Sequence, residues 1–138
     1  MSCKSKSITV NTNGRGLYEI TSNINVLIGE FKVDSGLAHI FLKHTSASLI
    51  ITENADPTVL QDLETIISRV APDGDPAYRH DYEGDDDMAA HVRSVLTSND
   101  LMIPIHQRAL ALGTWQGVFL WEHRYQTHTR SLTITFIE

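Results

Sequence analysis

The sequence predicts an α+β fold: a mixed or largely antiparallel β-sandwich with about three helices packed at one side. The strand and helix patterns follow the order ββαββααββββ, and the lack of a regular β–α alternation argues against a doubly wound parallel sheet. The chain has 138 residues, which fits one domain. Its hydrophobic content of 41% and charged content of 20% are ordinary for a globular protein. We therefore expect a single domain over residues 1–138.

The first part of the chain is rich in strand patterns. Alternating or continuous apolar residues predict strands over Ser7–Thr12, Leu17–Ile20, Leu37–Lys43 and Ser48–Thr52. The Asn13-Gly14 turn signal suggests that the first two strands form a hairpin. Between the second and third strands, apolar residues at helical spacing predict a helix over Asn23–Val33, capped by Thr21 or Ser22.

Two further helices are predicted in the middle of the chain. Asp56-Pro57 is a strong helix start, with the aspartate as N-cap and the proline at the first helical position. The buried face of this helix is predicted to consist of Val59, Leu60, Leu63, Ile66, Ile67 and Val70. A polar loop over Pro72–Asp87 follows, longer than most connections and therefore mobile or functional. Met88, Val92, Val95 and Leu96 then indicate a third helix, with Asp85–Asp87 at its positive end.

The last third of the chain reads as β structure. Strands are predicted over Leu101–Ile105, Ala109–Leu112, Thr114–Arg124 and Ser131–Ile137, with a turn at Gly113. Strand alternation puts Trp115, Trp121 and His123 on one face and Glu122 and Arg124 on the other. Glu122 and His123 therefore enter one pocket only if a bulge intervenes or two subunits contribute. We expect an ion pair between Glu122 and Arg124, and core or interface packing for the two tryptophans.

Charge and composition narrow the class of partner. The net charge of −6 argues against nucleic acid, which usually requires a basic surface. No apolar run approaches the ~20 residues of a membrane span. The N-terminal segment has no signal-peptide pattern, so a cytoplasmic location is expected. The one cysteine, Cys3, cannot form an internal disulfide.

Seven histidines invite a metal hypothesis, although none has a tight metal-ligand spacing. His44 ends an apolar strand and precedes Thr45, Ser46 and Ser48, whose hydroxyls suit an anion such as phosphate. The alternative is that His44 only bonds within its own turn. Nucleophile-elbow, P-loop and dinucleotide-binding motifs are absent.

Two sets of residues that contain carboxylates are further candidates for the site. Asp87 and His91 are spaced to share a helix face, so the carboxylate could orient the imidazole. The alternative is a helix N-terminal aspartate beside a boundary histidine. Glu53, Asn54 and Asp56 cluster just after a strand, and Asp56 has its second interpretation as an N-cap.

Three segments resemble the signature blocks of the YjbQ family. These are HTSASLIITENADP at 44–57, EGDDDMAAH at 83–91 and LALGTWQGVFLWEHR at 110–124. The family consists of small proteins to which a secondary thiamine-phosphate synthase activity has been attributed. The resemblance implies an α+β sandwich-like fold and a homotrimer with pockets near subunit boundaries.

The resemblance also implies a set of site residues. The catalytic group would be Glu53, Asp56, Asp87, Glu122 and Arg124. Substrate or phosphate would be bound by Thr45, Ser46, Ser48, Asn54, Arg93, Thr114 and Gln116. A divalent metal ion (Zn, Mg or Mn) would be held by His44, His91 and His123, with His80 as an additional candidate.

The chain departs from the family pattern at several positions. Thr52, Ala89 and Arg93 replace a usual Asn, Pro and Lys, and Arg93 keeps the charge with a different geometry. Val95 and residues 97–99 depart from a run of small residues, which puts a phosphate contact there in doubt.

The implied reaction joins a hydroxymethylpyrimidine diphosphate to a thiazole phosphate and releases pyrophosphate. It needs a cation at the leaving diphosphate and a pocket that stabilises developing positive charge on the pyrimidine. We therefore expect a small phosphorylated metabolite as ligand. The alternatives are a metal-dependent hydrolase and a non-enzymatic trimeric protein that binds a metal or an anion.

Overall fold

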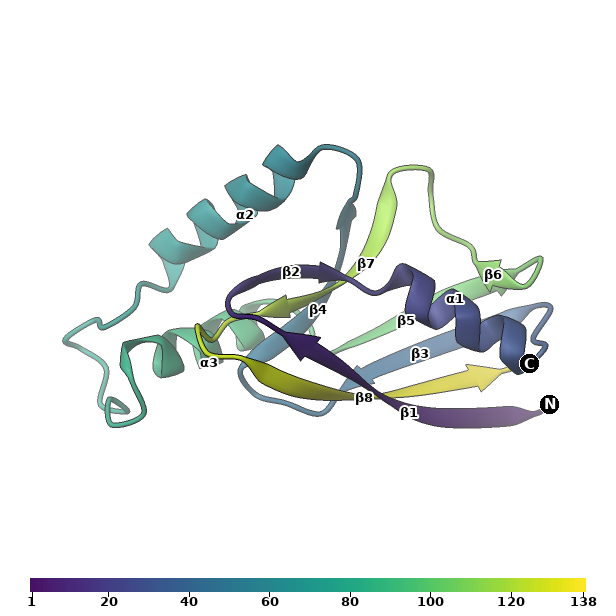
Figure 1. The fold of residues 1–138 in the computed structure, drawn as a ribbon, viewed down its shortest axis with the longest axis horizontal. Helices are drawn as coiled ribbons and strands as arrows, with labels where there is room; N and C mark the ends of the chain where they lie inside the picture. The colour runs from purple at the N-terminus through teal and green to yellow at the C-terminus, as the bar shows by residue number, and fades with distance from the viewer.

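Two antiparallel sheets form the framework of the molecule in the computed structural model, which describes residues 1–138 (Figure 1). The elements are β1 (Cys3–Thr12), β2 (Gly16–Glu19), α1 (Thr21–Glu30), β3 (Gly36–Leu42), β4 (Ala47–Glu53), α2 (Pro57–Val70), α3 (Asp85–Leu96), β5 (Asp100–His106), β6 (Ala109–Leu110), β7 (Gln116–Glu122) and β8 (His128–Ile137). The larger sheet has the order β1-β8-β3-β5-β6, and the smaller one has the order β2-β7-β4. The predicted α+β class and the order ββαββααββββ are confirmed.

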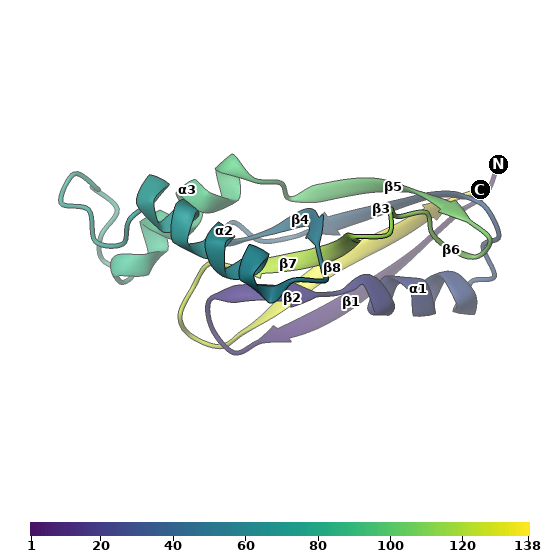
Figure 2. The ribbon, with the colours of Figure 1, turned by 90° about the horizontal axis from the view of Figure 1, so that it is seen from above.

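The apolar core lies where the inner faces of both sheets meet α1. Strand β8 shows how the sequence builds it: Leu132, Ile134 and Phe136 alternate with partly exposed residues and are all fully buried. Helix α1 contributes Ile24 and Ile28 to the same cluster. Figure 2 shows α1 alongside the sheets, at the end of the molecule away from α3.

The predicted hairpin between the first two strands is wrong. Strand β1 pairs with β8 in the larger sheet, and β2 pairs with β7 in the smaller one. The turn at Asn13-Gly14 therefore carries the chain from one sheet to the other. Gly14 has a φ of 108°, and a Cβ there would lie 2.8 Å from the carbonyl oxygen of Tyr125. Glycine is thus required by both conformation and space.

Helix α1 begins earlier than predicted and lacks the predicted side-chain cap. Ile20 occupies the N-cap position, and no side chain bonds to the helix start. The Thr21 hydroxyl is already used: it donates to Glu19 and accepts from the Val118 N–H. These bonds fasten the start of α1 to β2 and β7.

Helix α2 starts as predicted but buries none of its residues. The Asp56 side chain accepts a hydrogen bond from the Thr58 N–H at 2.9 Å, so the N-cap is confirmed. The predicted buried face is only half-buried at Val59, Leu60, Leu63 and Ile67. The prediction is wrong for Ile66 and Val70, which are 54% and 58% exposed. Figure 1 shows α2 standing away from the smaller sheet. Glu64 ties it to the body of the molecule.

Helix α3 buries a polar face. It begins at Asp85, inside the predicted loop, and its buried residues are Asp87, Ala89, Ala90 and Arg93. Val95, one of the apolar residues that indicated the helix, is 83% exposed. None of the three helices combines the length and the apolar content needed to cross a membrane.

Candidate functional site

A cluster of two histidines and one aspartate lies at the N-terminal half of α3. Asp87 and His91 are one helical turn apart, and His80 reaches them from the loop that precedes the helix. The Asp87 Oδ2 atom lies 2.6 Å from His80 Nε2 and 3.3 Å from His91 Nε2. The three candidate ligand atoms lie within 4.8 Å of one another. Two imidazole nitrogens and a carboxylate oxygen form a donor set suited to a divalent metal ion.

The main chain fixes the tautomer of His91. Its Nδ1 atom lies 3.1 Å from the carbonyl oxygen of Thr45, which can only accept a hydrogen bond. The proton of neutral His91 therefore sits on Nδ1, and the Nε2 lone pair faces Asp87 Oδ2. Two lone pairs facing each other repel unless a cation lies between them. A proton or a metal ion would supply that cation.

The second oxygen of Asp87 is held by Arg124. Arg124 donates to Asp87 Oδ1 at 2.5 Å and to Asp86 Oδ2 at 3.0 Å. Burial raises the pKa of Asp87, but its bonds to His80 and Glu83 and the charge of Arg124 outweigh burial and hold the pKa below its usual value. Asp87 is therefore an anion whose Oδ2 is left to the histidines. The hydrogen bond to Asp87 in turn raises the pKa of His80.

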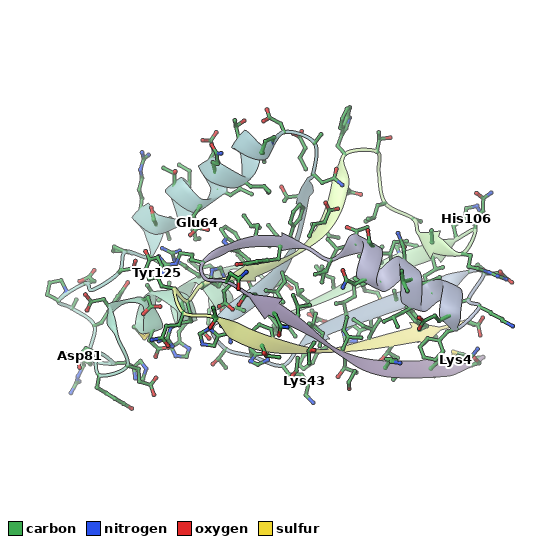
Figure 3. All side chains as sticks on the ribbon, viewed as in Figure 1. Lys4, Lys43, Glu64, Asp81, His106 and Tyr125 are labelled. Carbon is green, nitrogen blue, oxygen red and sulfur yellow. The ribbon has the colours of Figure 1, made fainter.

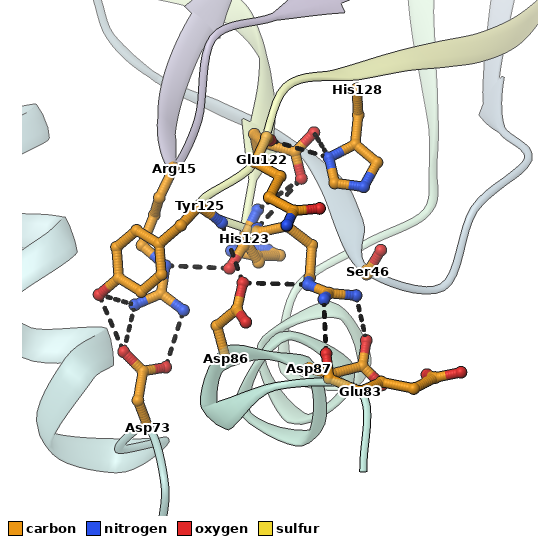
Figure 4. A network of polar contacts seen from close by, with 12 residues as sticks. Arg15, Ser46, Asp73, Glu83, Asp86, Asp87, Glu122, His123, Tyr125 and His128 are labelled. Atoms are coloured by element: carbon orange, nitrogen blue, oxygen red, sulfur yellow. Dashed lines mark hydrogen bonds and ion pairs between the residues drawn. The ribbon is translucent and has the colours of Figure 1, made fainter. Parts of the chain in front are cut away.

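Glu122 is buried and lies in the same network of polar contacts as Asp86 and Asp87 (Figure 4). Its carboxylate accepts from Thr12 at 2.7 Å, from two guanidinium nitrogens of Arg130, and from the N–H groups of His123 and Arg124 at 3.1 Å. The predicted ion pair between the side chains of Glu122 and Arg124 is wrong. Strand β7 ends at Glu122, so the strand alternation does not extend to Arg124. Glu122 instead fixes the backbone from which Arg124 reaches Asp87.

His123 is also buried, on the other side of β7 from Glu122. Its Nε2 atom lies 2.8 Å from the Ser48 hydroxyl, and its ring contacts Trp121 at 5.2 Å between centroids. Burial, reinforced by the positive charge of Arg93, lowers the pKa of His123 to about 3. The predicted alternation of Glu122 and His123 is confirmed, and so is core packing of Trp121, whereas Trp115 is exposed.

His44 bonds across to β8 rather than within its own turn. Its Nε2 atom accepts from the Ser131 N–H at 2.7 Å, and its Nδ1 atom lies 3.4 Å from Arg130. Burial and the positive charge of Arg130 lower its pKa. The structure therefore does not gather His44, His91 and His123 around one point. It brings His91 together with His80 and Asp87 instead.

Two hollows flank the His80–Asp87–His91 cluster. We call the larger one the α3 groove; it has a volume of about 370 Å³ and is lined by His44, Thr45, His91, Ser94, Val95, Thr97, Ser98 and Asn99. The smaller has a volume of about 200 Å³ and is lined by His80 and Asp81 of the preceding loop and by Asp85 at the start of α3. The cluster can thus be reached from the groove through His91 and from the loop side through His80.

The hydroxyl-rich turn contributes unevenly to this site. Thr45 lines the α3 groove and supplies the carbonyl that bonds His91. Ser46 and Ser48 are buried and bond to Arg130 and His123. Only Thr45 of these three hydroxyl residues is placed to meet a ligand.

Arg93 is fully buried and bonds to Glu64 at 2.8 Å and to the carbonyl oxygen of Ala71 at 3.2 Å. Trp121 donates to the same Glu64 at 2.7 Å. These three side chains connect α2, α3 and β7. The guanidinium of Arg93 is therefore engaged in holding the helices and does not reach the site surface.

The remaining predicted site residues form a second group at the far end of β4. Glu53 pairs with Gln116 in the register of β4 and β7, and β4 puts them about 20 Å from Ala47 at roughly 3.3 Å per residue. Local contacts occupy them: Glu53 accepts from the Asp56 N–H and Asn54 donates to Glu19. The second group consists of Glu53, Asn54, Asp56, Thr114 and Gln116. Within one chain it does not meet the histidine cluster.

Sequence reasoning missed Arg130, which neutralises Glu122 and adjoins His44. A signal was present: Arg130 precedes Leu132 and Ile134 at the period of a strand, so alternation places it on the inner face. Asp86 was missed as the second partner of Arg124. Nothing in its sequence context separates it from Asp85 and Asp87.

Comparison with known proteins gives one family throughout. The model of a family described as "UPF0047 protein YjbQ-like" matches residues 6–138. A UPF0047 protein of Synechocystis is 47% identical over 127 residues, covering 92% of this chain and 86% of its own length. The UPF0047 protein YjbQ of Escherichia coli O157:H7 is 42% identical over 131 residues, covering 94% of both chains.

Solved structures show the same fold. A conserved hypothetical protein from Thermus thermophilus superposes with a TM-score of 0.86 at 32% identity, covering 96% of this chain and 99% of that one. An uncharacterised YjbQ/UPF0047 protein from Clostridium acetobutylicum gives a TM-score of 0.84 at 30% identity, covering 97% and 99%. The fold of the whole chain is thus shared with proteins that have been solved experimentally.

Proposed function

This chain belongs to the UPF0047 YjbQ-like family, and we propose that it binds a divalent metal ion at His80, Asp87 and His91 and acts there on a small phosphorylated metabolite. The orientation of His91 carries the proposal. Its Nε2 lone pair is held toward Asp87 Oδ2 by the Thr45 carbonyl, an arrangement that a cation between the two atoms would stabilise.

Three protein ligands leave coordination positions open to a ligand or to water. A metal ion there would neutralise the oxygens of a phosphate or diphosphate. Arg124 keeps Asp87 ionised and bonds to its Oδ1, so Oδ2, which faces His80 and His91, would be the oxygen that binds the ion. The part of the ligand remote from its phosphate would extend into the α3 groove, which His91 also lines.

The specific reaction that we propose to test is thiamine-phosphate synthesis, in which the thiazole phosphate displaces pyrophosphate from the hydroxymethylpyrimidine diphosphate. A metal-bound diphosphate is the better leaving group, because the cation offsets its developing charge. Metal-dependent hydrolysis is the second candidate. The observation that favours it is that the cluster offers only three ligand atoms, so a bound ion would have room for a water that could act as a nucleophile.

A metal-binding measurement tests the first part of the proposal, the metal site itself. Purified protein is dialysed against zinc or manganese, and bound metal is counted by elemental analysis. We expect one ion per chain, and loss of that ion in His80→Ala, Asp87→Asn and His91→Ala. His106→Ala is the matched control, because His106 is exposed at the opposite end of the molecule from Asp81 (Figure 3). Equal metal content in control and cluster variants would refute the site.

Turnover separates the candidate functions. The metal-loaded protein is incubated with the two substrates, and thiamine phosphate and free pyrophosphate are measured. Thiamine phosphate that disappears in Asp87→Asn supports the synthase. Phosphate release from the diphosphate substrate alone supports the hydrolase. If the protein binds one metal ion per chain but forms neither product, it is a metal-binding protein rather than one of these two enzymes.

We also propose that the chain forms a homotrimer. The apolar face of α2, with Ile66 and Val70 exposed, needs a partner to cover it. The separation of the second group from the histidine cluster supports the same proposal, because a neighbouring subunit could bring its Glu53 and Asn54 to this cluster.

A further inference from the structure

The α3 groove offers a ligand hydrogen-bond acceptors. Three of its side-chain hydroxyls, those of Ser94, Thr97 and Ser98, each donate to a backbone carbonyl oxygen at 3.1, 2.8 and 2.6 Å. A hydroxyl has a single proton, so each of these oxygens has only lone pairs left for a ligand, and Ser98 Oγ already uses one to accept from the Asp100 N–H at 3.4 Å. A phosphate, which needs donors, would meet oxygen lone pairs along this wall.

The end of α3 makes the groove electronegative. The helix ends at Leu96, and Thr97 is its C-cap. The carbonyls of the last turn lack intrahelical partners, apart from that of Arg93, which accepts from the Thr97 N–H. The helix dipole places about half a negative charge at this end. No lysine, arginine, aspartate or glutamate lines the groove to offset or replace that potential.

His44, at the other side of the groove, does not supply a compensating cation. Burial and the charge of Arg130 lower its pKa, so the ring is neutral at neutral pH. Its Nε2 atom is taken by the Ser131 N–H. The Arg130 guanidinium behind it is buried and paired with Glu122, and Arg130 does not line the groove.

We propose that the α3 groove binds a nitrogen-bearing, donor-rich group, either a protonated amine or an amino group on a heterocycle. The ligand would then be bipolar, with its anionic end at His80, Asp87 and His91 and its N–H donors against Ser94, Thr97 and Ser98. The placement of the anionic end rests on the proposed function. The preference of the groove itself does not, because it follows from the hydroxyl bonds and the helix end.

The groove can be tested in metal-free protein with three probes that share one carbon skeleton. Chelator-treated ¹⁵N-labelled protein is titrated with n-butylammonium, n-butyrate and n-butanol, and backbone amide resonances are followed by NMR. We expect butylammonium to shift the resonances of Thr45 and residues 94–99 at the lowest concentration of the three. Butyrate or inorganic phosphate acting on these resonances at equal or lower concentration would overturn the proposal, as would no response to butylammonium.

Charge variants at one exposed position test whether the groove prefers a positively charged ligand. Val95 lines the groove and is largely exposed, so its replacement leaves the core intact. We expect Val95→Glu to tighten butylammonium binding about fivefold and Val95→Lys to weaken it about fivefold, as for one charge near the ligand in a partly screened site. Val26→Glu and Val26→Lys on α1 are the matched controls and should leave the affinity unchanged. An equal response to both charges at Val95 would contradict the proposal.

The heterocyclic source is distinguished from the aliphatic amine by adding 4-aminopyrimidine as a fourth probe. Tighter binding of this probe than of butylammonium assigns the groove to an amino-heterocycle, and the reverse order assigns it to an amine. Because the protein is free of metal, a failure of the metal site leaves these results unaffected. If elemental analysis finds the metal but neither butylammonium nor 4-aminopyrimidine binds to the metal-free protein, the proposed function stands and this inference is wrong.

Discussion

Glu122 shows how one buried carboxylate organises residues that lie outside its own strand. It accepts hydrogen bonds from the main chain at His123 and Arg124 and from the side chain of Arg130. A buried charge is tolerated only when it is paired and hydrogen-bonded. The pair therefore positions Arg124, which in turn positions Asp87.

Glu122→Gln removes the charge that Arg130 faces and places an amide among donors. We expect the free energy of unfolding to fall by about 3 kcal/mol, as is usual when one partner of a buried ion pair is lost. Urea unfolding followed by circular dichroism measures this change. Asp34→Asn is the matched control, because its pair with Arg108 is exposed, and it should cost less than about 1 kcal/mol. A similar cost for both variants would contradict the structural role of Glu122.

The buried ring of His123 predicts a loss of stability in acid. Its pKa falls from 6.5 to about 3 on folding, so the folded protein excludes a proton that the unfolded chain binds. This contribution is fully present above pH 6.5 and is lost as the pH falls toward about 3, with a slope of up to about 1.4 kcal/mol per pH unit. Unfolding free energies between pH 4 and pH 8 should show the slope, and His123→Gln should flatten it. The exposed His106→Gln control should retain it.

At the scale of elements, α2 is held by a polar contact in addition to apolar residues that are only half-buried. Glu64 accepts from the buried Arg93 and from Trp121, and no residue of α2 is buried. Glu64→Ala would leave the guanidinium of Arg93 buried with only a carbonyl partner. We expect a destabilisation of about 3 kcal/mol in chemical unfolding. The exposed Asp62→Ala on the same helix should change the stability by less than about 0.5 kcal/mol.

Elements with a local signal were predictable from the sequence. Asp56-Pro57 set the start of α2, and alternation along β7 placed Glu122 and His123 on opposite sides. The partners of β1 and β2 were not predictable, because pairing depends on strands about a hundred residues away or more. A turn signal such as Asn13-Gly14 specifies a change of direction and not the strand that receives the chain.

The site was predictable in part for the same reason. Asp87 and His91 share a helix face by spacing alone, and the structure does bring them together. His80 lies in an irregular loop, where no periodicity indicates its direction. The family resemblance implied that Arg93 binds phosphate, and no sequence signal indicated that it is buried against Glu64 of α2.

At the scale of the whole molecule, the exposed apolar residues of α2 predict that the chain forms an oligomer, which we propose is a trimer. Light scattering of the purified protein should give about three times the chain mass of 15.4 kDa. Ile66→Glu and Val70→Glu should shift it toward the monomer, because each puts a charge into an apolar contact. Val26→Glu, on the exposed side of α1, is the control and should leave the mass unchanged. A monomer for the unmodified chain would refute the trimer.

Helix α3 also fixes the distance between the two ends of the proposed ligand site. Asp87 stands near its start and Val95 near its end, and eight residues at roughly 1.5 Å each separate them by about 12 Å. Because the helix is rigid, the spacing between the proposed metal site and the acceptor end of the α3 groove is fixed before any ligand arrives. A ligand that reaches both must match that length, so an extra residue inserted between His91 and Ser94 would disrupt selection by size even where each end remains intact.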